Sequence, residues 1–146
     1  MHHWSVTDSA SETDLAVLSE GVVSCGRALA VGGNAKPIAC LVRDEHAIVA
    51  GASGRTEFNR LFVGYLWVAE NLRSKGLGSK VLLELEHAAI GRGCTDSLLE
   101  TLSTTAAELY ARLGYRHLAQ VPGYVGPFTK HVMLKSFAGS NGARGA

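Results

Sequence analysis

The chain has 146 residues, 47% of them hydrophobic, and a formal net charge of +1 at pH 7. This length predicts one domain that buries roughly 70% of its unfolded surface, so its core needs no disulfide or metal. The near-neutral charge and the lack of a long basic run argue against a nucleic-acid or membrane-surface partner.

The sequence shows no recognisable targeting signal, and its cysteines and histidines do not indicate a special class of protein. No apolar segment is long enough to span a bilayer and no charged-then-apolar leader opens the chain, so we expect a cytoplasmic protein. Cys25, Cys40 and Cys94 lack the paired spacing of a zinc site and should be reduced and mostly buried. The histidines are scattered without a spaced partner, and we expect no metal site.

The N-terminal segment predicts a short strand and a helix. Trp4–Thr7 has strand character, and Ser9-Ala10-Ser11-Glu12 matches a capping box. The apolar stripe that follows consists of Leu15, Leu18, Val22, Cys25 and Leu29. Gly21 and Gly26 each weaken a helix by about 1 kcal/mol relative to alanine, so we expect this helix to bend or split before it ends at 31–34.

Three strands follow. Ile38–Val42 and Ala47–Ala50 form a predicted hairpin around a polar turn at 43–46. A second turn, Gly54–Glu57, should lead to the central strand Leu61–Val68, whose aromatic and β-branched residues fit a buried pleated surface. The front half of the sheet is therefore predicted to be antiparallel.

The helix after the central strand is predicted from its period. Val81, Leu82, Leu85, Ala88 and Ala89 form an apolar stripe that can face the sheet. The residues expected in solvent are Lys80, Glu84, His87 and Arg92. Gly91 and Gly93 should end the helix.

Between strand and helix lies Arg73-Ser74-Lys75-Gly76-Leu77-Gly78-Ser79. Its glycines permit turns and close backbone approach, and the first amides of the helix have no internal partner. A phosphate is a natural ligand for such a helix start, and Arg73, Lys75 and Lys80 add positive charge. A solvated loop without a ligand is the simplest alternative.

The last third of the chain should complete the sheet. Ser97–Leu102 predicts a strand parallel to the central one, because a helix connects them. A helix over Thr105–Leu113 ends at Gly114. The last strands are Tyr115–Val121 and His131–Ser136, with Pro122–Phe128 as a loop between them. Residues 138–146 have nothing to bury and should form a flexible tail.

Three kinds of phosphate site can be compared with the glycine-containing turn. A Walker loop is excluded because Ser79, not Lys, follows Gly78. The dinucleotide fingerprint fits poorly because Val81 stands where a third small residue is needed. The order strand, Arg-x-x-Gly-x-Gly, helix resembles the pyrophosphate-binding motif of the GNAT superfamily of N-acetyltransferases.

A second motif agrees with this resemblance. Ser103-x-x-Ala106-x-x-Leu109-Tyr110-x-x-Leu113-Gly114-Tyr115 is similar to the family pattern Asn-x-x-Ala-x-x-Phe/Leu-Tyr-x-x-Leu-Gly-Phe. The resemblance implies an α/β (mixed α+β) fold: a mostly antiparallel sheet of about six to seven strands, flanked by helices, with a central parallel crossover. It implies one acetyltransferase domain over residues 1–137.

The resemblance also assigns roles to residues. Tyr110 would be the general acid for the departing thiolate, and the Val68 amide would polarise the thioester carbonyl. The acetyl-CoA site would consist of Leu66, Trp67, Val68, Arg73, Ser74, Lys75, Gly76, Leu77, Gly78, Ser79 and Ser103. Ser103 stands where the family has an Asn that holds the pantetheine arm, so this contact would be shorter or absent.

The implied reaction is direct attack of an amine on acetyl-CoA. The acceptor would be a primary amine of a small molecule or peptide, and the resemblance allows a homodimer. The base that deprotonates the amine is not identified; Glu57, Glu70 and Glu100 are candidates. Two alternatives stay open: an acyl-CoA-sensing module of the same fold without turnover, and a nicotinamide or nucleotide binder that uses Gly76 and Gly78.

Overall fold

The computed structural model describes residues 1–29 and 34–137. The chain divides into two compact units, Met1–Gly33 and Asn34–Ala146, which are described separately. The single domain over residues 1–137 stays a prediction, and the predicted tail lies outside the described residues.

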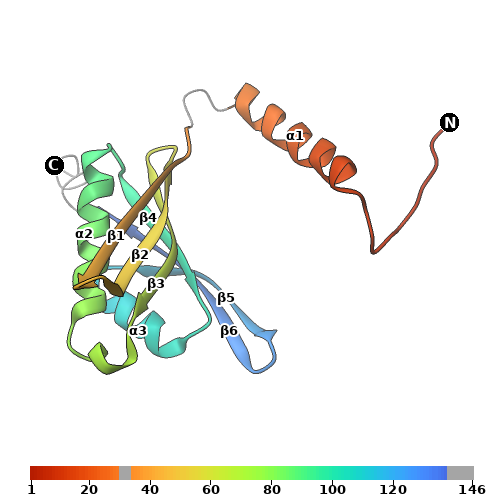
Figure 1. Cartoon of the computed structure of the whole chain (residues 1–146). Coiled ribbons are helices and arrows are strands. Elements are labelled where there is room, and N and C mark those ends of the chain that lie inside the picture. Colours follow the sequence, from red (N-terminus) through yellow and green to blue (C-terminus); the bar gives the residue numbers. More distant parts are fainter. Residues whose placement is uncertain (30–33, 138–146) are drawn as a thin grey trace. The chain divides into compact units, whose positions relative to one another are not determined.

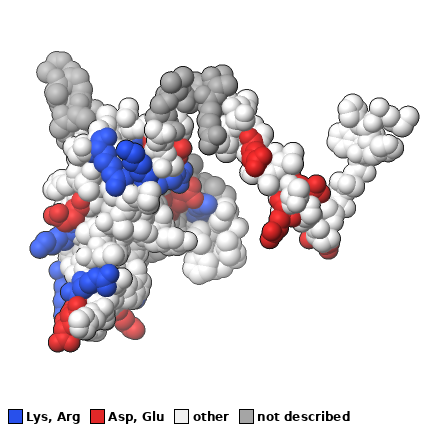
Figure 2. Space-filling view, turned by 45° about the horizontal axis from the view of Figure 1, so that its top comes forward, with Lys and Arg blue, Asp and Glu red and all other residues white. Residues whose placement is uncertain are grey.

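The first unit contains one helix, α1 (Glu12–Leu29), among its described residues (Figure 1). The predicted strand at Trp4–Thr7 is wrong, because residues 1–10 form neither helix nor strand. Ser11 caps α1: its Oγ accepts a hydrogen bond from the Asp14 amide at 3.1 Å. Asp14 also belongs to an acidic first turn that suits the helix dipole, and red side chains mark this segment in Figure 2. The helix runs through Gly21 and Gly26 without interruption, so the predicted split is wrong.

The second unit is built on a sheet. Its six strands in the described residues are β1 (Lys36–Asp44), β2 (Ala47–Glu57), β3 (Arg60–Val68), β4 (Asp96–Thr101), β5 (Arg116–Val125) and β6 (Phe128–Ser136). Their order across the sheet is β1-β2-β3-β4-β6-β5. Only β3 and β4 pair in parallel; the other neighbouring strands are antiparallel. The predicted mixed, mostly antiparallel sheet with a parallel crossover is confirmed.

The turn between β2 and β3 lies later than predicted. Gly54–Glu57 belongs to β2, and the turn consists of Phe58 and Asn59, whose φ angles are 52° and 61°. Gly54 is needed for close packing rather than for a turn: a Cβ there would lie 1.9 Å from the Phe62 carbonyl oxygen. The β2–β3 register shifts between Ser53 and Gly54, so this glycine belongs to a bulge.

The predicted loop at Pro122–Phe128 is also wrong in most of its length. Strand β5 extends to Val125 and β6 begins at Phe128, so the two strands form a long hairpin. Pro122 lies inside β5, which is tolerable because β5 is at the edge of the sheet, where a missing amide breaks no inner ladder. The β5–β6 register shifts twice along this hairpin.

Helix α2 (Leu77–Gly91) packs on β1, β2 and β3 and makes the first core cluster (Figure 1). Leu61, Val81, Leu85 and Ala89 are buried in it. The helix ends at Gly91 as predicted. One assignment on it is wrong, because Ala88 is exposed; Glu86, to which the periodicity gave no place, is buried.

Helix α3 (Thr104–Arg112) covers the other half of the same sheet face. Its Ala107 joins a second cluster with Leu82 of α2, Leu99 of β4 and Met133 of β6. Its bounds lie within one residue of the predicted helix. Tyr115 follows α3 and packs in this second cluster.

A polar network crosses the second cluster. The Tyr115 hydroxyl lies 2.7 Å from Glu86 Oε2 and 2.8 Å from Ser97 Oγ, and Lys135 Nζ donates to Glu86 Oε1 at 2.7 Å. A phenol has one proton and a carboxylate only accepts, so we assign that proton to Glu86 and let Ser97 donate to the phenol oxygen. The buried Glu86 charge is thereby paired and hydrogen-bonded.

Surface charge and hydropathy agree with the composition. On the face of residues 34–137 seen in Figure 2, basic and acidic side chains are both present. No helix among the described residues has the length and apolar character needed to cross a bilayer.

Candidate active site

The central feature of the site is an opening between β3 and β4. Among the described residues these strands pair only at Arg60–Asp96, Leu61–Ser97 and Phe62–Leu98. Arg60 and Asp96 form a two-bond ion pair at the closed end, with distances of 2.8 and 2.9 Å. Beyond Phe62 the two strands separate, and the rest of β3 pairs with no strand of the described residues on that side.

The register of β2 and β3 fixes where the Val68 amide points. Ala69 donates to the Val49 carbonyl at 2.8 Å, so Ala69–Val49 is a hydrogen-bonded pair of this antiparallel ladder. Such pairs alternate with pairs that do not bond to each other. The next pair, Val68–Ala50, is therefore a non-hydrogen-bonded pair. The N–H and C=O of Val68 point away from β2, into the opening. Leu66, paired with Ala52, points the same way.

The turn after β3 brings an open helix end to this opening. A short 3-10 helix, η1 (Glu70–Leu72), precedes it, and Arg73 Nε then donates back to the Val68 carbonyl at 2.9 Å. Gly76 has φ 80°, a left-handed conformation that glycine adopts without strain, and it stands directly before α2. The first amides of α2 lack helical partners and are suited to an anion.

A groove of about 800 Å³ joins these parts. The predicted cofactor residues that line it are Leu66, Trp67, Val68, Arg73, Ser74, Gly76, Leu77, Gly78, Ser79 and Ser103. Lys75 is exposed in the same turn and does not line the groove. The structure therefore brings together nearly all of the residues predicted for this site.

One wall of this groove consists of residues that were not predicted from the sequence. Leu72 and four residues of α3, Thr105, Ala106, Leu109 and Arg112, also line it. Thr105, Leu109 and Arg112 follow helical spacing of four and three residues, which places them on one face. This pattern was available in the sequence, and it adds a second arginine to the groove.

Ser103 performs a structural task at the start of α3. Its Oγ accepts a hydrogen bond from the Ala106 amide at 3.0 Å, which makes it the N-cap. A serine hydroxyl that accepts in a cap still has its own proton to donate. The side chain that replaces the family's Asn is thus anchored at the groove with one donor left.

Tyr110 does not line the groove. Its ring is half-buried against the second cluster, 5.9 Å from the Tyr115 ring at an angle of 58°. Among the described residues, no hydrogen-bond partner of its hydroxyl is found. Burial raises the pKa of Tyr110, so the phenol stays protonated at neutral pH and can donate.

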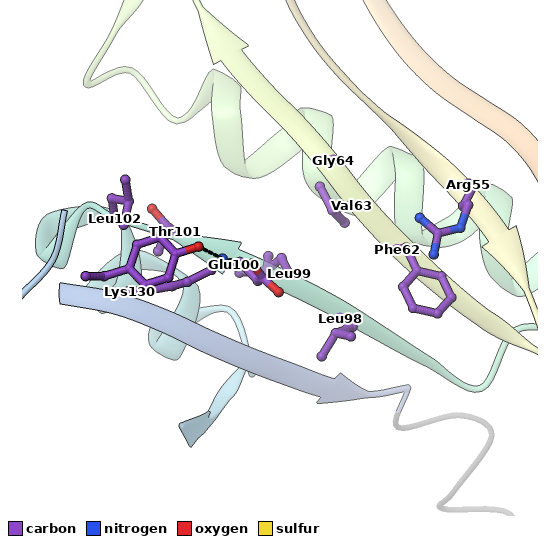
Figure 3. A pocket seen from close by; sticks show the side chains of 11 residues that line it. Arg55, Phe62, Val63, Gly64, Leu98, Leu99, Glu100, Thr101, Leu102 and Lys130 are labelled. Carbon is purple, nitrogen blue, oxygen red and sulfur yellow. Dashed lines mark hydrogen bonds and ion pairs between the residues drawn. The ribbon is translucent and has the colours of Figure 1, made fainter. Parts of the chain in front are cut away.

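A second cleft, of about 580 Å³, opens between β3 and β4 (Figure 3). Its charged end contains Glu100, which pairs with Lys130 Nζ at 2.6 Å; Lys130 also donates to the Tyr124 hydroxyl at 3.2 Å. The hydrogen bond to Glu100, more than that to Tyr124, raises the pKa of Lys130. Lys130 is thus an ammonium at neutral pH, and Glu100 is the carboxylate that lines the cleft.

The other two candidate bases lie elsewhere. Glu57 does not line the cleft and accepts from Arg55 Nε at 3.1 Å. Glu70 is exposed in η1 and lines neither the groove nor the cleft. Among the three candidates, the structure places only Glu100 at the opening between the strands.

The cysteines and histidines differ partly from expectation. Cys94 is buried and Cys40 partly so, but Cys25 is exposed. Burial raises the pKa of the Cys40 and Cys94 thiols, which keeps both protonated. His117 Nε2 and His131 Nδ1 lie 3.0 Å apart across β5 and β6, a contact that the spacing of the histidines in the sequence did not indicate. The described residues contain no cluster of three or more metal-ligating side chains.

A sheet that opens at its parallel pair, with a glycine turn and a helix start at the opening, defines an acyltransferase-like fold. The model of the acetyltransferase (GNAT) family matches residues 10–115. The chain belongs to this family.

Relatives and solved structures agree. The chain is 36% identical over 98 residues to a blasticidin-S acetyltransferase of Streptomyces morookaense, covering 66% of this chain and 71% of the relative. The crystal structure of an acetyltransferase from Bacillus cereus has a TM-score of 0.85 and 25% identity, over 91% of this chain and 98% of that one. An aminoglycoside 6'-N-acetyltransferase solved with coenzyme A shares the fold, with a TM-score of 0.59, 20% identity and coverage of 68% and 72%.

Proposed function

We propose that this protein transfers the acetyl group of acetyl-CoA to a primary amine by direct attack in a ternary complex. The observation that carries the proposal is the opening of β3 from β4, which leaves the Val68 amide facing a groove that ends at the start of α2. One strand thus presents a donor for a carbonyl and leads to an anion-binding turn.

The groove fits acetyl-CoA. Its apolar walls, Leu66, Val68 and Leu109, suit a pantetheine arm, and the outward N–H and C=O of Leu66 can bond to the arm's amides as another strand would. Gly76 to Ser79 offer amides to the pyrophosphate, and Arg112 adds charge. Arg73 keeps one guanidinium nitrogen on the Val68 carbonyl and has others for phosphate.

We assign one residue to each step of the reaction. Glu100, directly or through a water, takes a proton from the bound ammonium, whose ordinary pKa of about 10.4 keeps it unreactive at pH 7. The neutral nitrogen forms a bond to the thioester carbon while the Val68 amide donates to the carbonyl oxygen. The C–S bond then breaks, Tyr110 gives its proton to the thiolate, and the second proton that the nitrogen must lose returns to the phenolate.

The acceptor we propose is a small-molecule amine rather than a peptide. The support is the blasticidin-S acetyltransferase, which is named for a small-molecule substrate and is 36% identical to this chain over 98 residues. Blasticidin S is accordingly the first acceptor to test, followed by aminoglycosides and N-terminal peptides as a comparison.

A second candidate is an acyl-CoA sensor without turnover. Ser103 favours it, because its Oγ is already engaged in capping α3 and offers the cofactor arm less than an Asn would. Release of free CoA thiol on addition of an amine distinguishes the two candidates: an enzyme releases thiol in proportion to time, and a sensor does not.

The experiment combines binding with turnover. We expect acetyl-CoA and CoA, but not NAD or ATP, to raise the melting temperature, because binding to the native state adds about 2.7 kcal/mol at 100-fold over Kd. Gly78→Leu should weaken CoA binding at least about tenfold by blocking the backbone's approach to phosphate. Gly91→Leu, at the open far end of the same helix, is the matched control and should bind normally. Unchanged CoA affinity in Gly78→Leu would contradict the pyrophosphate assignment.

A further inference from the structure

The cleft between β3 and β4 has two ends of different chemistry (Figure 3). Glu100, Lys130 and Leu102 lie at one end, and Arg55 above Phe62 lies at the other. Val63 and Leu98 lie between the two ends and are apolar. An acceptor that fills the cleft therefore meets a charged group at each end and hydrocarbon in the middle.

Arg55 is held in place with part of its guanidinium unused. Its Nε donates to Glu57 at 3.1 Å, and its Cζ lies 4.1 Å from the centre of the Phe62 ring. Among the described residues no partner of its two terminal nitrogens is found. A planar guanidinium fixed by a carboxylate on one side and an aromatic face beneath is pre-organised to bind an oxyanion with two parallel hydrogen bonds.

The charges of the cleft favour the same class of ligand. Its charged lining residues are two cations, Arg55 and Lys130, and one carboxylate, Glu100, which Lys130 already pairs. A polycationic acceptor would meet a second cation at the Arg55 end, where Glu57 engages only the guanidinium Nε. An acceptor with one amine and one anionic group places each beside an opposite charge.

One end of the cleft lies next to the cofactor groove, and this decides where the reacting amine binds. Leu102 lines the cleft, and the next residue, Ser103, lines the cofactor groove, so the Glu100 end adjoins the acetyl donor. The reacting amine belongs at Glu100, and the anion belongs at Arg55.

The register of the sheet gives the spacing. Arg55 pairs with Phe62 and Phe62 pairs with Leu98, so these three residues form one row across the sheet. Glu100 lies two residues further along β4 on the same face. With strands about 4.8 Å apart and about 3.3 Å per residue, the guanidinium over Phe62 and the Glu100 carboxylate are roughly 8 to 10 Å apart.

We propose that the acceptor is an amine that carries an anionic group, a carboxylate or a phosphate monoester, roughly 8 to 10 Å from the reacting nitrogen, and that Arg55 binds this anion. The inference rests on the proposed function, because it takes the cleft as the acceptor site. It excludes α-amino acids as good acceptors, since their amine and carboxylate are too close together to reach both ends.

The test uses probes that differ only in charge. 8-Aminooctanoate spans roughly 10 Å when extended, and 8-aminooctanamide has the same length without the charge. With wild-type protein and acetyl-CoA, we expect kcat/KM to be about tenfold or more higher for the acid, because hydrogen bonds to a charged group are the stronger kind. Arg55→Gln should remove this advantage, mostly through KM, by lowering the acid's kcat/KM much more than the amide's; Arg55→Lys should keep part of it.

Controls separate this inference from the proposed function. Arg43→Gln removes an exposed arginine of β1 outside the cleft and should keep the preference. Calorimetric binding of the two probes in the presence of CoA measures the anion site without turnover. Selective binding of the acid that depends on Arg55, with no acetylation, would support the anion site and contradict the enzyme. Acetylation of acid and amide at equal kcat/KM would support the enzyme and overturn the anion site, as would a failure of both to bind.

A third probe, with a phosphate group, distinguishes between a phosphate and a carboxylate as the anion bound. 7-Aminoheptyl phosphate carries the same amine at a similar reach, and a preference for it over 8-aminooctanoate that is lost in Arg55→Gln would assign a phosphate rather than a carboxylate to this end. Equal loss of both anionic probes in Arg43→Gln would overturn the assignment to Arg55.

Discussion

The second unit contains two groups of the same composition, each with a Glu, a Lys and a Tyr, and both lysines belong to β6. In one, Glu86, Lys135 and Tyr115 lie between α2 and the sheet, and the side chains of Glu86 and Lys135 are 3% and 17% exposed. In the other, Glu100, Lys130 and Tyr124 line the cleft on the opposite face, and the side chains of Glu100 and Lys130 are 51% and 24% exposed. The ion-pair distances, 2.7 and 2.6 Å, are nearly equal.

Burial, rather than geometry, separates the two groups. A buried ion pair cannot lose one member without leaving an uncompensated charge, so the Glu86 group can only hold elements together. An exposed pair contributes little to stability, and its charges can exchange one partner for another. The Glu100 carboxylate is thus free to act on a substrate, whereas the Glu86 carboxylate is not.

The largest expected effect is on stability. Glu86→Ala leaves Lys135 and Tyr115 without their buried acceptor and should lower the free energy of unfolding by about 3 to 5 kcal/mol. Urea unfolding measures it. Glu84→Ala, on the exposed side of the same helix, is the control and should change stability by less than about 0.5 kcal/mol. Equal losses in the two variants would erase the contrast between the groups.

Glu100→Gln should show the reverse pattern. We expect kcat to fall by about 100- to 1000-fold, since general base catalysis is lost, and the free energy of unfolding to change by less than about 1 kcal/mol. Thiol release and urea unfolding on the same samples give both values. Glu108→Gln, an exposed glutamate of α3, should have normal activity. If Glu100→Gln kept its kcat, the cleft would need another base.

Tyr110→Phe tests the acid. Without the phenol proton we expect kcat to fall by about tenfold to 100-fold, which is less than the usual effect of about 100- to 10,000-fold because a thiolate leaves readily. The Kd for acetyl-CoA should stay unchanged, because Phe keeps the ring and the phenol proton is needed only when the thiolate leaves. Tyr65→Phe, an exposed tyrosine of β3, is the matched control. A change in Kd without a change in kcat would make Tyr110 a packing residue.

The smallest expected effect is on the pH dependence of stability, to which the buried Tyr115 contributes. Burial, with Glu86 as a further cause, raises the pKa of Tyr115 far above its ordinary value of about 10. Below pH 10 the phenol is protonated in both states and adds no pH dependence. Above it the unfolded phenol ionises and the native one does not, so stability falls as pH rises.

At pH 10.5 this loss amounts to roughly 0.8 kcal/mol. Urea unfolding at pH 9 and pH 10.5 should show a drop that is smaller by this amount in Tyr115→Phe than in the wild type. A Tyr124→Phe variant, from the exposed group, should keep the wild-type drop. Identical drops in Tyr115→Phe and the wild type would mean that Tyr115 ionises normally in the native state.

Much of the fold and of the cofactor groove was accessible from the sequence. The run Leu61–Val68, the glycine turn and the apolar period of α2 are contiguous, so local propensity and periodicity report them directly. The face of α3 that follows Ser103 is likewise visible in the helical spacing of the sequence. The predicted element was wrong where a residue typical of turns or loops has another role. Gly54 indicates a turn but belongs to a β-bulge, and Pro122 indicates a loop but lies in an edge strand.

The sequence by itself determined the family, the order of the elements and the residues around the turn at Arg73–Ser79, because each depends on neighbours along the chain. Only the tertiary structure decided which charges meet. Arg55, Glu100 and Lys130 come from three strands and share a cleft because of the sheet register and the separation of β3 from β4. Glu86 and Glu100 look alike in sequence, and their different roles follow from burial, which is a property of the packed fold.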